Sequence, residues 1–364
     1  MSPFLNRFAK ILLVTLLLLY VLACRAEDDD DTDDDQADDD ADDDDASDDD
    51  LVGDDDTEYV LYGLHSYFCS DPPDWPYCWD LYACRDFDCS LMVSQDSQAG
   101  IAWSIWASSP QDVFVVGGSR MIYHFNGLSW RRELKWSDES LFDIWGSDWN
   151  DVYAVGELHP EAWEHRGHII LHFNGYEWRQ VKSGLDRSAY AVWGSSDSDV
   201  FVVGDNLILH YDGAEWVEMA TTDYWHLISV WGSAHDDVFA SGWDENEKAL
   251  IVHYDGISWN KMTTNFPEDL WHVGSLWGFG PTDVYGAGDA YADSEYSLIL
   301  HYDGKSWLEV WRLEEFFPSF TAIWGTTSSN IYVSGLTGLY HFDESTWSHV
   351  DGVPYLYDIY GVKL

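Results

Sequence analysis

The sequence predicts an all-β fold, a single β-propeller of four-stranded blades that follows a disordered acidic N-terminal tether. Three observations support this prediction. One motif is repeated six times along the chain, twelve tryptophans recur at fixed places in it, and residues 27–56 hold 20 aspartates and one glutamate. Repeats of roughly 40 to 50 residues are typical of propeller blades, because each unit must stack on its neighbours to bury its apolar faces.

Each copy of the motif has two halves. The first half, as in VWGSSDSDVFVVG, begins at Ile105, Ile144, Val192, Val230, Leu276 and Ile323. The second half reads like LHYDGAEW, and successive first-half tryptophans are 38 to 48 residues apart. Three stretches of each copy are apolar and β-prone, and Asn-Gly or Asp-Gly supplies a tight turn before a fourth strand. We therefore expect four antiparallel strands per unit.

Two residue types are locked to the repeat. The tryptophans of the first strand are Trp106, Trp145, Trp193, Trp231, Trp277 and Trp324, and those of the fourth are Trp130, Trp178, Trp216, Trp259, Trp307 and Trp347. The histidines of the third strand are His124, His172, His210, His253, His301 and His341. We expect the tryptophans to pack between blades. Equivalent histidines are spread around a ring and cannot converge on one ion, so we interpret them as structural and predict neither a metal site nor a cofactor.

The number of blades depends on how the ends of the chain meet. Residues 101–364 hold the repeats, and the chain ends in LYDIYGVKL from Leu356, which is a seventh first strand and nothing more. Residues 57–100 can supply the missing strands, with TEYVLYG in place of DVFVVG. Seven blades are favoured over six, because a six-bladed ring leaves the last strand without a place.

The N-terminus predicts export. In residues 1–23, Arg7 and Lys10 precede a 13-residue apolar run, which is too short to span a bilayer and fits a signal peptide. The run ends in VLAC, which resembles the lipobox of bacterial lipoproteins and implies lipid attachment to Cys24. Residues 24–56 are then a lipidated cysteine and a disordered linker. The alternative is an ordinary signal peptide with an incidental cysteine.

Charge excludes one class of partner. Residues 57–364 contain 46 acidic and 14 basic side chains, and nucleic acid is bound through Lys and Arg contacts to phosphate. We therefore predict no nucleic-acid partner, whereas cationic proteins and neutral glycans remain compatible. The Asp-rich linker could associate weakly with Ca²⁺, although it lacks the spaced Gly and final Glu of a Ca²⁺-binding loop.

Four further cysteines, Cys69, Cys78, Cys84 and Cys89, lie within 21 residues. In an exported chain they predict two disulfides, with three pairings open. A four-thiolate zinc site is the alternative, but the spacings lack CxxC knuckles.

The WGSSxxDVFVVG…ILHYDGxxW pattern resembles the propeller repeats of secreted lipoproteins from deltaproteobacteria, over about residues 101–361. The resemblance implies a lipid-anchored protein of the outer membrane that faces the cell surface or the periplasm. There is a weaker similarity to the Asp-box of sialidase-like propellers, SxDxGxTW. Here Asp and Gly are adjacent, as DGxxW, so sialidase chemistry is not implied.

The long, variable connections of the repeat all fall on one expected face of the ring. Aromatic residues concentrate in them and form a candidate ligand-binding face: Trp136, Trp163, Tyr224, Trp225, Trp243, Trp271, Tyr291, Trp311, Phe316 and Phe317. Exposed aromatics beside acids suit sugars and cationic groups. We therefore expect a non-catalytic binding or scaffold protein that recognises a glycan or a protein at the cell surface. The alternative is a polysaccharide hydrolase or lyase, for which Asp143 and Asp358, facing the central channel, are the only nominees.

Overall fold

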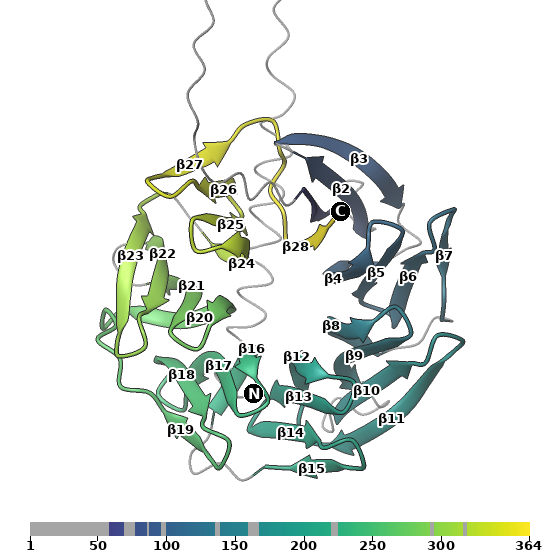
Figure 1. Cartoon of the computed structure of the whole chain (residues 1–364), viewed down its shortest axis with the longest axis horizontal. Coiled ribbons are helices and arrows are strands. Elements are labelled where there is room, and N and C mark those ends of the chain that lie inside the picture. Colours follow the sequence, from purple (N-terminus) through teal and green to yellow (C-terminus); the bar gives the residue numbers. More distant parts are fainter. Residues whose placement is uncertain are drawn as a thin grey trace, which may run out of the picture. The chain divides into compact units, whose positions relative to one another are not determined.

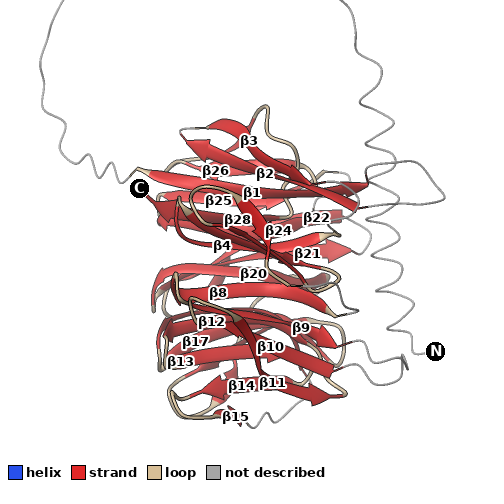
Figure 2. Ribbon diagram, turned by 90° about the vertical axis from the view of Figure 1, so that its right-hand side faces the viewer, coloured by secondary structure: helices blue, strands red, loops and turns tan. Residues whose placement is uncertain are grey.

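The computed structural model describes residues 58–68, 77–85, 87–95, 100–134, 139–158, 167–219, 225–291, 295–315 and 319–364. They form seven four-stranded antiparallel sheets around one axis, so the protein is a seven-bladed β-propeller (Figure 1). The predicted fold class is confirmed, with seven blades and not six. Seen edge-on, the strands run between the two faces of the ring (Figure 2). Within these ranges no helix is long and apolar enough to cross a membrane.

Blade 1 joins the two ends of the described chain. Its inner strand is the C-terminal β28 (Asp358–Lys363), followed outward by β1 (Tyr59–Phe68), β2 (Tyr77–Arg85) and β3 (Asp88–Gln95). Strands β28 and β1 are antiparallel, with Tyr360 opposite Tyr62. Backbone hydrogen bonds between the first and last strands therefore close the ring.

Blades 2 to 7 follow the chain order from the inside outward. The inner strands are β4 (Ala102–Ser109), β8 (Ser140–Asp148), β12 (Ala189–Ser196), β16 (Trp225–Ala234), β20 (Leu270–Gly280) and β24 (Phe320–Thr327). The second strands are β5 (Asp112–Gly117), β9 (Asp151–Leu158), β13 (Asp199–Gly204), β17 (Asp237–Asp244), β21 (Asp283–Tyr291) and β25 (Asn330–Gly335). The third strands are β6 (Met121–Phe125), β10 (Gly167–Phe173), β14 (Leu207–Tyr211), β18 (Ala249–Tyr254), β22 (Glu295–Tyr302) and β26 (Gly338–Phe342). The outer strands are β7 (Trp130–Arg132), β11 (Trp178–Leu185), β15 (Trp216–Glu218), β19 (Trp259–Lys261), β23 (Trp307–Leu313) and β27 (Trp347–Val350).

The turn between the third and outer strands follows from its Asp-Gly or Asn-Gly pair. In blade 4, Asp212 Oδ1 accepts hydrogen bonds from the backbone N–H groups of Ala214 and Glu215, and Gly213 has a φ of 87°. Glycine adopts this left-handed conformation without the steric cost of a Cβ atom. In blade 7 the same position is Glu344, with a φ of 74°.

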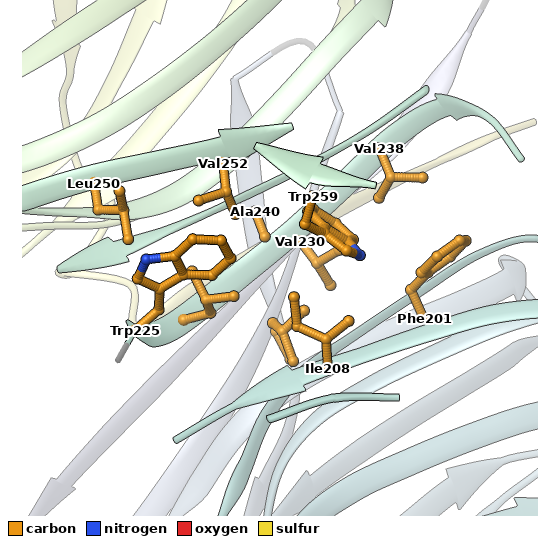
Figure 3. Packing of buried hydrophobic residues seen from close by; sticks show 12 residues of the cluster. Phe201, Ile208, Trp225, Val230, Val238, Ala240, Leu250, Val252 and Trp259 are labelled. Carbon is orange, nitrogen blue, oxygen red and sulfur yellow. The ribbon is translucent and has the colours of Figure 1, made fainter. Parts of the chain in front are cut away.

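Both sets of repeat-locked tryptophans, those of the inner strands and those of the outer strands, pack between blades, as predicted. A Cβ atom on Gly278 of blade 6 would lie only 2.6 Å from the ring of Trp231 in blade 5, so this glycine admits the preceding blade's indole. The outer-strand Trp259 of blade 5 lies 6.1 Å, between ring centroids, from Phe201 of blade 4. Figure 3 shows this interface, where Phe201 and Ile208 of blade 4 face Trp225 and Trp259.

The recurring histidines are structural, as predicted. In blade 4, His210 Nε2 lies 2.7 Å from Asp199 Oδ1, and its ring stacks on Phe201 with centroids 4.3 Å apart. The other five histidines make the same bond at 2.7 Å, to an aspartate in four blades and to Asn330 in blade 7. The hydroxyl of Ser195 also donates to Asp199, which ties the inner, second and third strands together.

Two of the predicted disulfide cysteines are joined, Cys84 to Cys89, at the turn between β2 and β3. Cys78 is also disulfide-bonded. Cys69, the signal peptide, Cys24 and the acidic linker lie outside the described residues. Lipid attachment therefore stays a prediction.

Candidate binding site at the propeller axis

The inner strands carry a β-bulge at the same place in six blades. In β4 the register with β5 shifts between Ala102 and Ser104, which leaves Trp103 without a partner residue on β5. The equivalent residues of the other five are Phe142, Tyr190, Ile228, Gly274 and Thr321. In blade 1, Tyr357 holds this place directly before β28. A β-bulge changes the direction in which the side chain of the extra residue points. All seven are partly exposed, and they belong to the strands nearest the axis (Figure 1).

Four of these seven residues are aromatic and occupy consecutive blades. The ring centroids are 5.2 Å apart for Tyr357 and Trp103, 6.4 Å for Trp103 and Phe142, and 5.6 Å for Phe142 and Tyr190. We call these four residues the aromatic arc. Blades 5, 6 and 7 carry Ile228, Gly274 and Thr321 instead, which we call the small arc. The axis is therefore lined by rings on one side and by small or aliphatic groups on the other.

Asp358 follows the first ring of the aromatic arc, Tyr357. Its Oδ2 accepts a hydrogen bond from the backbone N–H of Ile105 in blade 2 (3.0 Å), and its Oδ1 accepts one from the N–H of Ile359 (2.9 Å). The carboxyl thus joins blade 1 to blade 2. The side chain stays partly exposed at the axis.

Asp143 makes the corresponding link from blade 3. Its Oδ2 accepts a hydrogen bond from the backbone N–H of Val192 in blade 4 (2.8 Å). Its Oδ1 accepts from the N–H of Ile144 (2.9 Å) and from the hydroxyl of Ser104 in blade 2 (3.0 Å). A carboxylate has about four acceptor sites, so Asp143 retains roughly one and Asp358 at least one.

The ionised forms of Asp143 and Asp358 are disfavoured in this environment. Burial raises the pKa of Asp143 to about 6. Burial, and after it the nearby negative charge of Asp143, raises the pKa of Asp358 to about 7. Hydrogen bonds from backbone N–H groups oppose both shifts because they favour the ionised form. Among the described residues, neither carboxyl has a Lys or Arg partner.

The small-arc side of the ring makes the same inter-blade bond without a charge. Ser229 Oγ accepts from the backbone N–H of Leu276 (3.0 Å), and Ser275 Oγ accepts from the N–H of Ile323 (3.2 Å). These serines occupy the position that Asp143 and Asp358 occupy beside the aromatic arc. A neutral hydroxyl is therefore enough to join two blades, and the carboxyls add a charge that this bond does not need.

A second set of acids joins blades near the start of the inner strands. Each follows the glycine of a second strand and pairs with the next blade: Glu157 with Ser188, Asp205 with His226, and Asp289 with Ser319, at 3.1, 2.5 and 2.9 Å. Asp289 is only 1% exposed, and burial raises its pKa. Sequence reasoning missed this role, although an acid directly after the strand-ending glycine was the visible signal.

The predicted ligand-binding face is only partly described, and its loop assignment was wrong for five residues, of which four are tryptophans and the fifth is Tyr291. Trp225, Trp243, Trp271 and Trp311 lie in strands β16, β17, β20 and β23 rather than in loops. Trp225 is 2% and Trp243 5% exposed, so neither side chain is available to a ligand. Trp271 is partly exposed and stacks on Trp243, with centroids 5.5 Å apart. Strand pairing runs further along the chain than the repeat suggested, and it buries Trp225 and Trp243.

The structure gives little information on the remaining residues of that face. Trp311 is partly exposed but stacks on Trp347 of blade 7, with ring centroids 4.8 Å apart. Tyr291 ends β21, and its side chain is not described. The others lie outside the described residues: Trp136, Trp163, Tyr224, Phe316 and Phe317. Ligand binding by this face stays a prediction.

The carboxyls at the axis are fixed in position beside partly exposed rings. Both nominated carboxyls are held by backbone N–H groups of two blades, so neither is free to approach a substrate as a mobile acid or base. The partly exposed rings beside them offer flat apolar faces with a negative quadrupole, which suit sugars and cations. In the ranges given above, no three His, Cys, Asp or Glu side chains are grouped so as to hold a metal ion.

No family model matches the sequence, and no curated protein matches it either. Among solved structures, a protein from Lactobacillus plantarum aligns with a TM-score of 0.58 and 10% identity, over 84% of this chain and 99% of that chain. YCF48 bound to a D1 peptide aligns with a TM-score of 0.52 and 16% identity, over 70% and 83%. Saccharomyces cerevisiae Sqt1 aligns with a TM-score of 0.50 and 10% identity, over 74% and 78%. These similarities support the propeller fold.

Proposed function

We propose that this chain is a non-catalytic, lipid-anchored binding propeller of the bacterial outer membrane, and that it recognises a segment of a protein partner at the aromatic arc. The observation that carries the proposal is the asymmetry of the axis. Four partly exposed rings are contiguous on blades 1 to 4, although the fold needs no aromatic residue there, as the small arc demonstrates.

The anchoring part of the proposal rests on the sequence. The VLAC motif at Cys24 supplies a lipid anchor, and the acidic linker, about 30 residues long, supplies reach on the order of 100 Å when extended. A propeller held in this way can meet partners at a distance from the membrane. Its high negative charge keeps it away from nucleic acid and favours partners with positive charge.

A protein segment is favoured as the ligand by one structural neighbour. YCF48, which shares the fold at 16% identity, has been solved with a bound D1 peptide, so a propeller of this kind can hold a peptide. An extended peptide can place a single side chain against the rings at the axis while its backbone crosses the mouth of the ring. The aromatic arc lies where the inner strands begin.

The test is a pair of arrays, one of peptides and one of glycans, probed with the full chain. We expect peptides to bind and to be recovered unchanged, and Trp103→Leu to weaken binding while the small-arc variant Ile228→Ala leaves it intact. Binding to glycans alone would contradict the protein ligand. A shortened glycan or peptide product would contradict the non-catalytic role and restore the hydrolase or lyase alternative.

The anchor is tested separately. We expect the full chain, produced in a bacterium that processes lipoproteins, to incorporate labelled palmitate and to sediment with the outer membrane. Cys24→Ser should abolish both. Equal labelling of the variant would overturn the lipid anchor without affecting the binding proposal.

A further inference from the structure

The rings of the aromatic arc lie beside a pair of carboxyls whose charge a cationic ligand would offset. Two carboxyls, Asp143 and Asp358, lie beside the four rings, and their mutual repulsion helps to raise the pKa of Asp358. The hydroxyl of Ser104 in blade 2 donates its single hydrogen to Asp143 at 3.0 Å. In the described part of the chain no basic side chain balances this pair.

We propose that the aromatic arc and the Asp143–Asp358 pair form a recognition site for one arginine side chain of the protein partner. This inference rests on the proposed function and names the chemistry of its ligand. The rings supply faces for the cation, and the carboxyls supply the opposite charge.

The comparison with the small arc argues for a cationic ligand. Ser229 and Ser275 make the inter-blade bond with neutral hydroxyls, so the fold does not account for the charge on Asp143 and Asp358. Holding two like charges close together in a partly buried place costs free energy, and a bound cation reverses that cost. A sugar would leave the repulsion in place.

Arginine fits better than lysine for two reasons. Its planar guanidinium stacks on aromatic faces, and the spacing of 5.2 to 6.4 Å between successive ring centroids gives several faces within reach. Its several N–H donors can also fill the acceptor sites that Asp358 and Asp143 still have, whereas a lysine ammonium is a single point charge.

The site also predicts a dependence on pH. At low pH the carboxyls are protonated and a guanidinium gains little, whereas at higher pH the ionised pair attracts it. The titratable groups around the pair are Tyr357 directly before β28, whose pKa burial raises, and Tyr190 on β12, which donates to Asp205. Neither tyrosine ionises near neutral pH, because burial raises the pKa of each above its ordinary value. The carboxyls therefore control the dependence, and arginine should bind more tightly as the pH rises from 5.5 to 7.5.

The experiment compares two short Gly/Ser peptides that differ only in a central arginine or its neutral isostere citrulline. Their affinities for the full chain are measured by ligand-observed NMR at pH 5.5 and 7.5, in salt sufficient to screen the acidic linker. We expect the arginine peptide to bind on the order of tenfold more tightly than the citrulline peptide at pH 7.5, and this preference to shrink at pH 5.5. Trp103→Leu leaves every charge in place. If this variant loses the preference for arginine, the preference comes from the aromatic arc and not from general attraction to an acidic protein.

The outcomes are distinct. Loss of the preference in Trp103→Leu and in Asp143→Ser/Asp358→Ser, with retention in Ile228→Ala, supports the site. Equal binding of arginine and citrulline peptides, or an unchanged preference in Trp103→Leu, overturns it. If array peptides without arginine bind at the aromatic arc, this inference falls while the proposed function stands. If no peptide binds at all, both fall.

Discussion

Blades 1 to 4 and blades 5 to 7 share one backbone plan but present different chemistry to the axis. Both sides bulge at the same residue of the inner strand, and both join neighbouring blades through a side chain that accepts a backbone N–H. Blades 1 and 3 do this with carboxyls beside rings, and blades 5 and 6 do it with serines beside aliphatic or small residues. The backbone therefore sets the position, and the side chain at that position differs between the two sides.

The largest expected effect concerns the small-arc side, where Asp289 is buried between blades 6 and 7. Asp289→Ala should lower the free energy of unfolding by about 3 kcal/mol, because Ser297, Ser319 and the N–H of Phe320 all lose their acceptor. Chemical denaturation measures the change. The control is Asp351→Ala, an exposed acid 99% accessible, which should change little. Equal effects of the two substitutions would show that Asp289 does not join the blades.

Disulfide loss should have the next largest effect, confined to blade 1. Cys84→Ser/Cys89→Ser removes a crosslink between residues five apart, and a loop this short corresponds to roughly 2 kcal/mol of stability. Because blade 1 closes the ring, amide hydrogen exchange in β28 and β1 should accelerate more than in blade 5. Uniform acceleration around the ring would contradict a local role for this disulfide in closure.

The charge difference between the two sides can be removed by substitution. Asp143→Ser/Asp358→Ser gives the aromatic side the serines of the other side and keeps the inter-blade acceptors. Both carboxyls have a raised pKa in the folded protein, so the unfolded chain releases their protons first. Their contribution to stability is present at pH 4 and below and is lost as the pH rises through 6 and 7.

We therefore expect the double variant to be more stable than the wild type at pH 8, by about 1–2 kcal/mol after allowing for water at the axis, and little different at pH 4. Denaturation at pH 4, 6 and 8 measures this. Asp197→Ser/Asp351→Ser removes the same two charges from exposed sites and controls for overall repulsion. A destabilised double variant at pH 8 would show that the carboxyls serve the fold.

The smallest effect tests a single turn. Glu344 takes the left-handed position that glycine holds in the other five repeat turns. Glu344→Gly should raise the free energy of unfolding by about 0.5–1 kcal/mol, because glycine adopts this conformation without strain, partly offset by its greater freedom in the unfolded chain. Gly213→Glu in blade 4 is the reciprocal change and should destabilise. The same sign for the two substitutions would contradict this account of the turn.

The fold could be predicted from the sequence because the repeat encodes it locally. The Asp-Gly turns, the Trp-Gly pairs and the lone first strand at Leu356 each indicate which strands or blades are adjacent. The segments concerned lie within 50 residues of one another, and the repeat occurs six times. The aromatic arc could not be predicted in the same way. A bulge depends on the register between strands, and Trp103, Phe142 and Tyr357 look like ordinary β-strand residues when read in order.

Burial was the other property that the sequence did not reveal. Trp225 and Trp243 fall where the repeat varies and were expected on exposed loops, yet β16 and β17 extend through them and bury both. Asp143 and Asp358 were expected at the channel because of their place in the first strand. Their role in joining blades could not be predicted, because it depends on hydrogen bonds to the neighbouring blade.

The most direct test of the central claim is a crystal structure of the full chain with the arginine-containing peptide that it binds most tightly. The account predicts the guanidinium against Trp103 and Phe142, with its N–H groups directed at Asp143 and Asp358, and the small arc unoccupied. A peptide bound across the small arc, or on the outer strands with the aromatic arc empty, would contradict it.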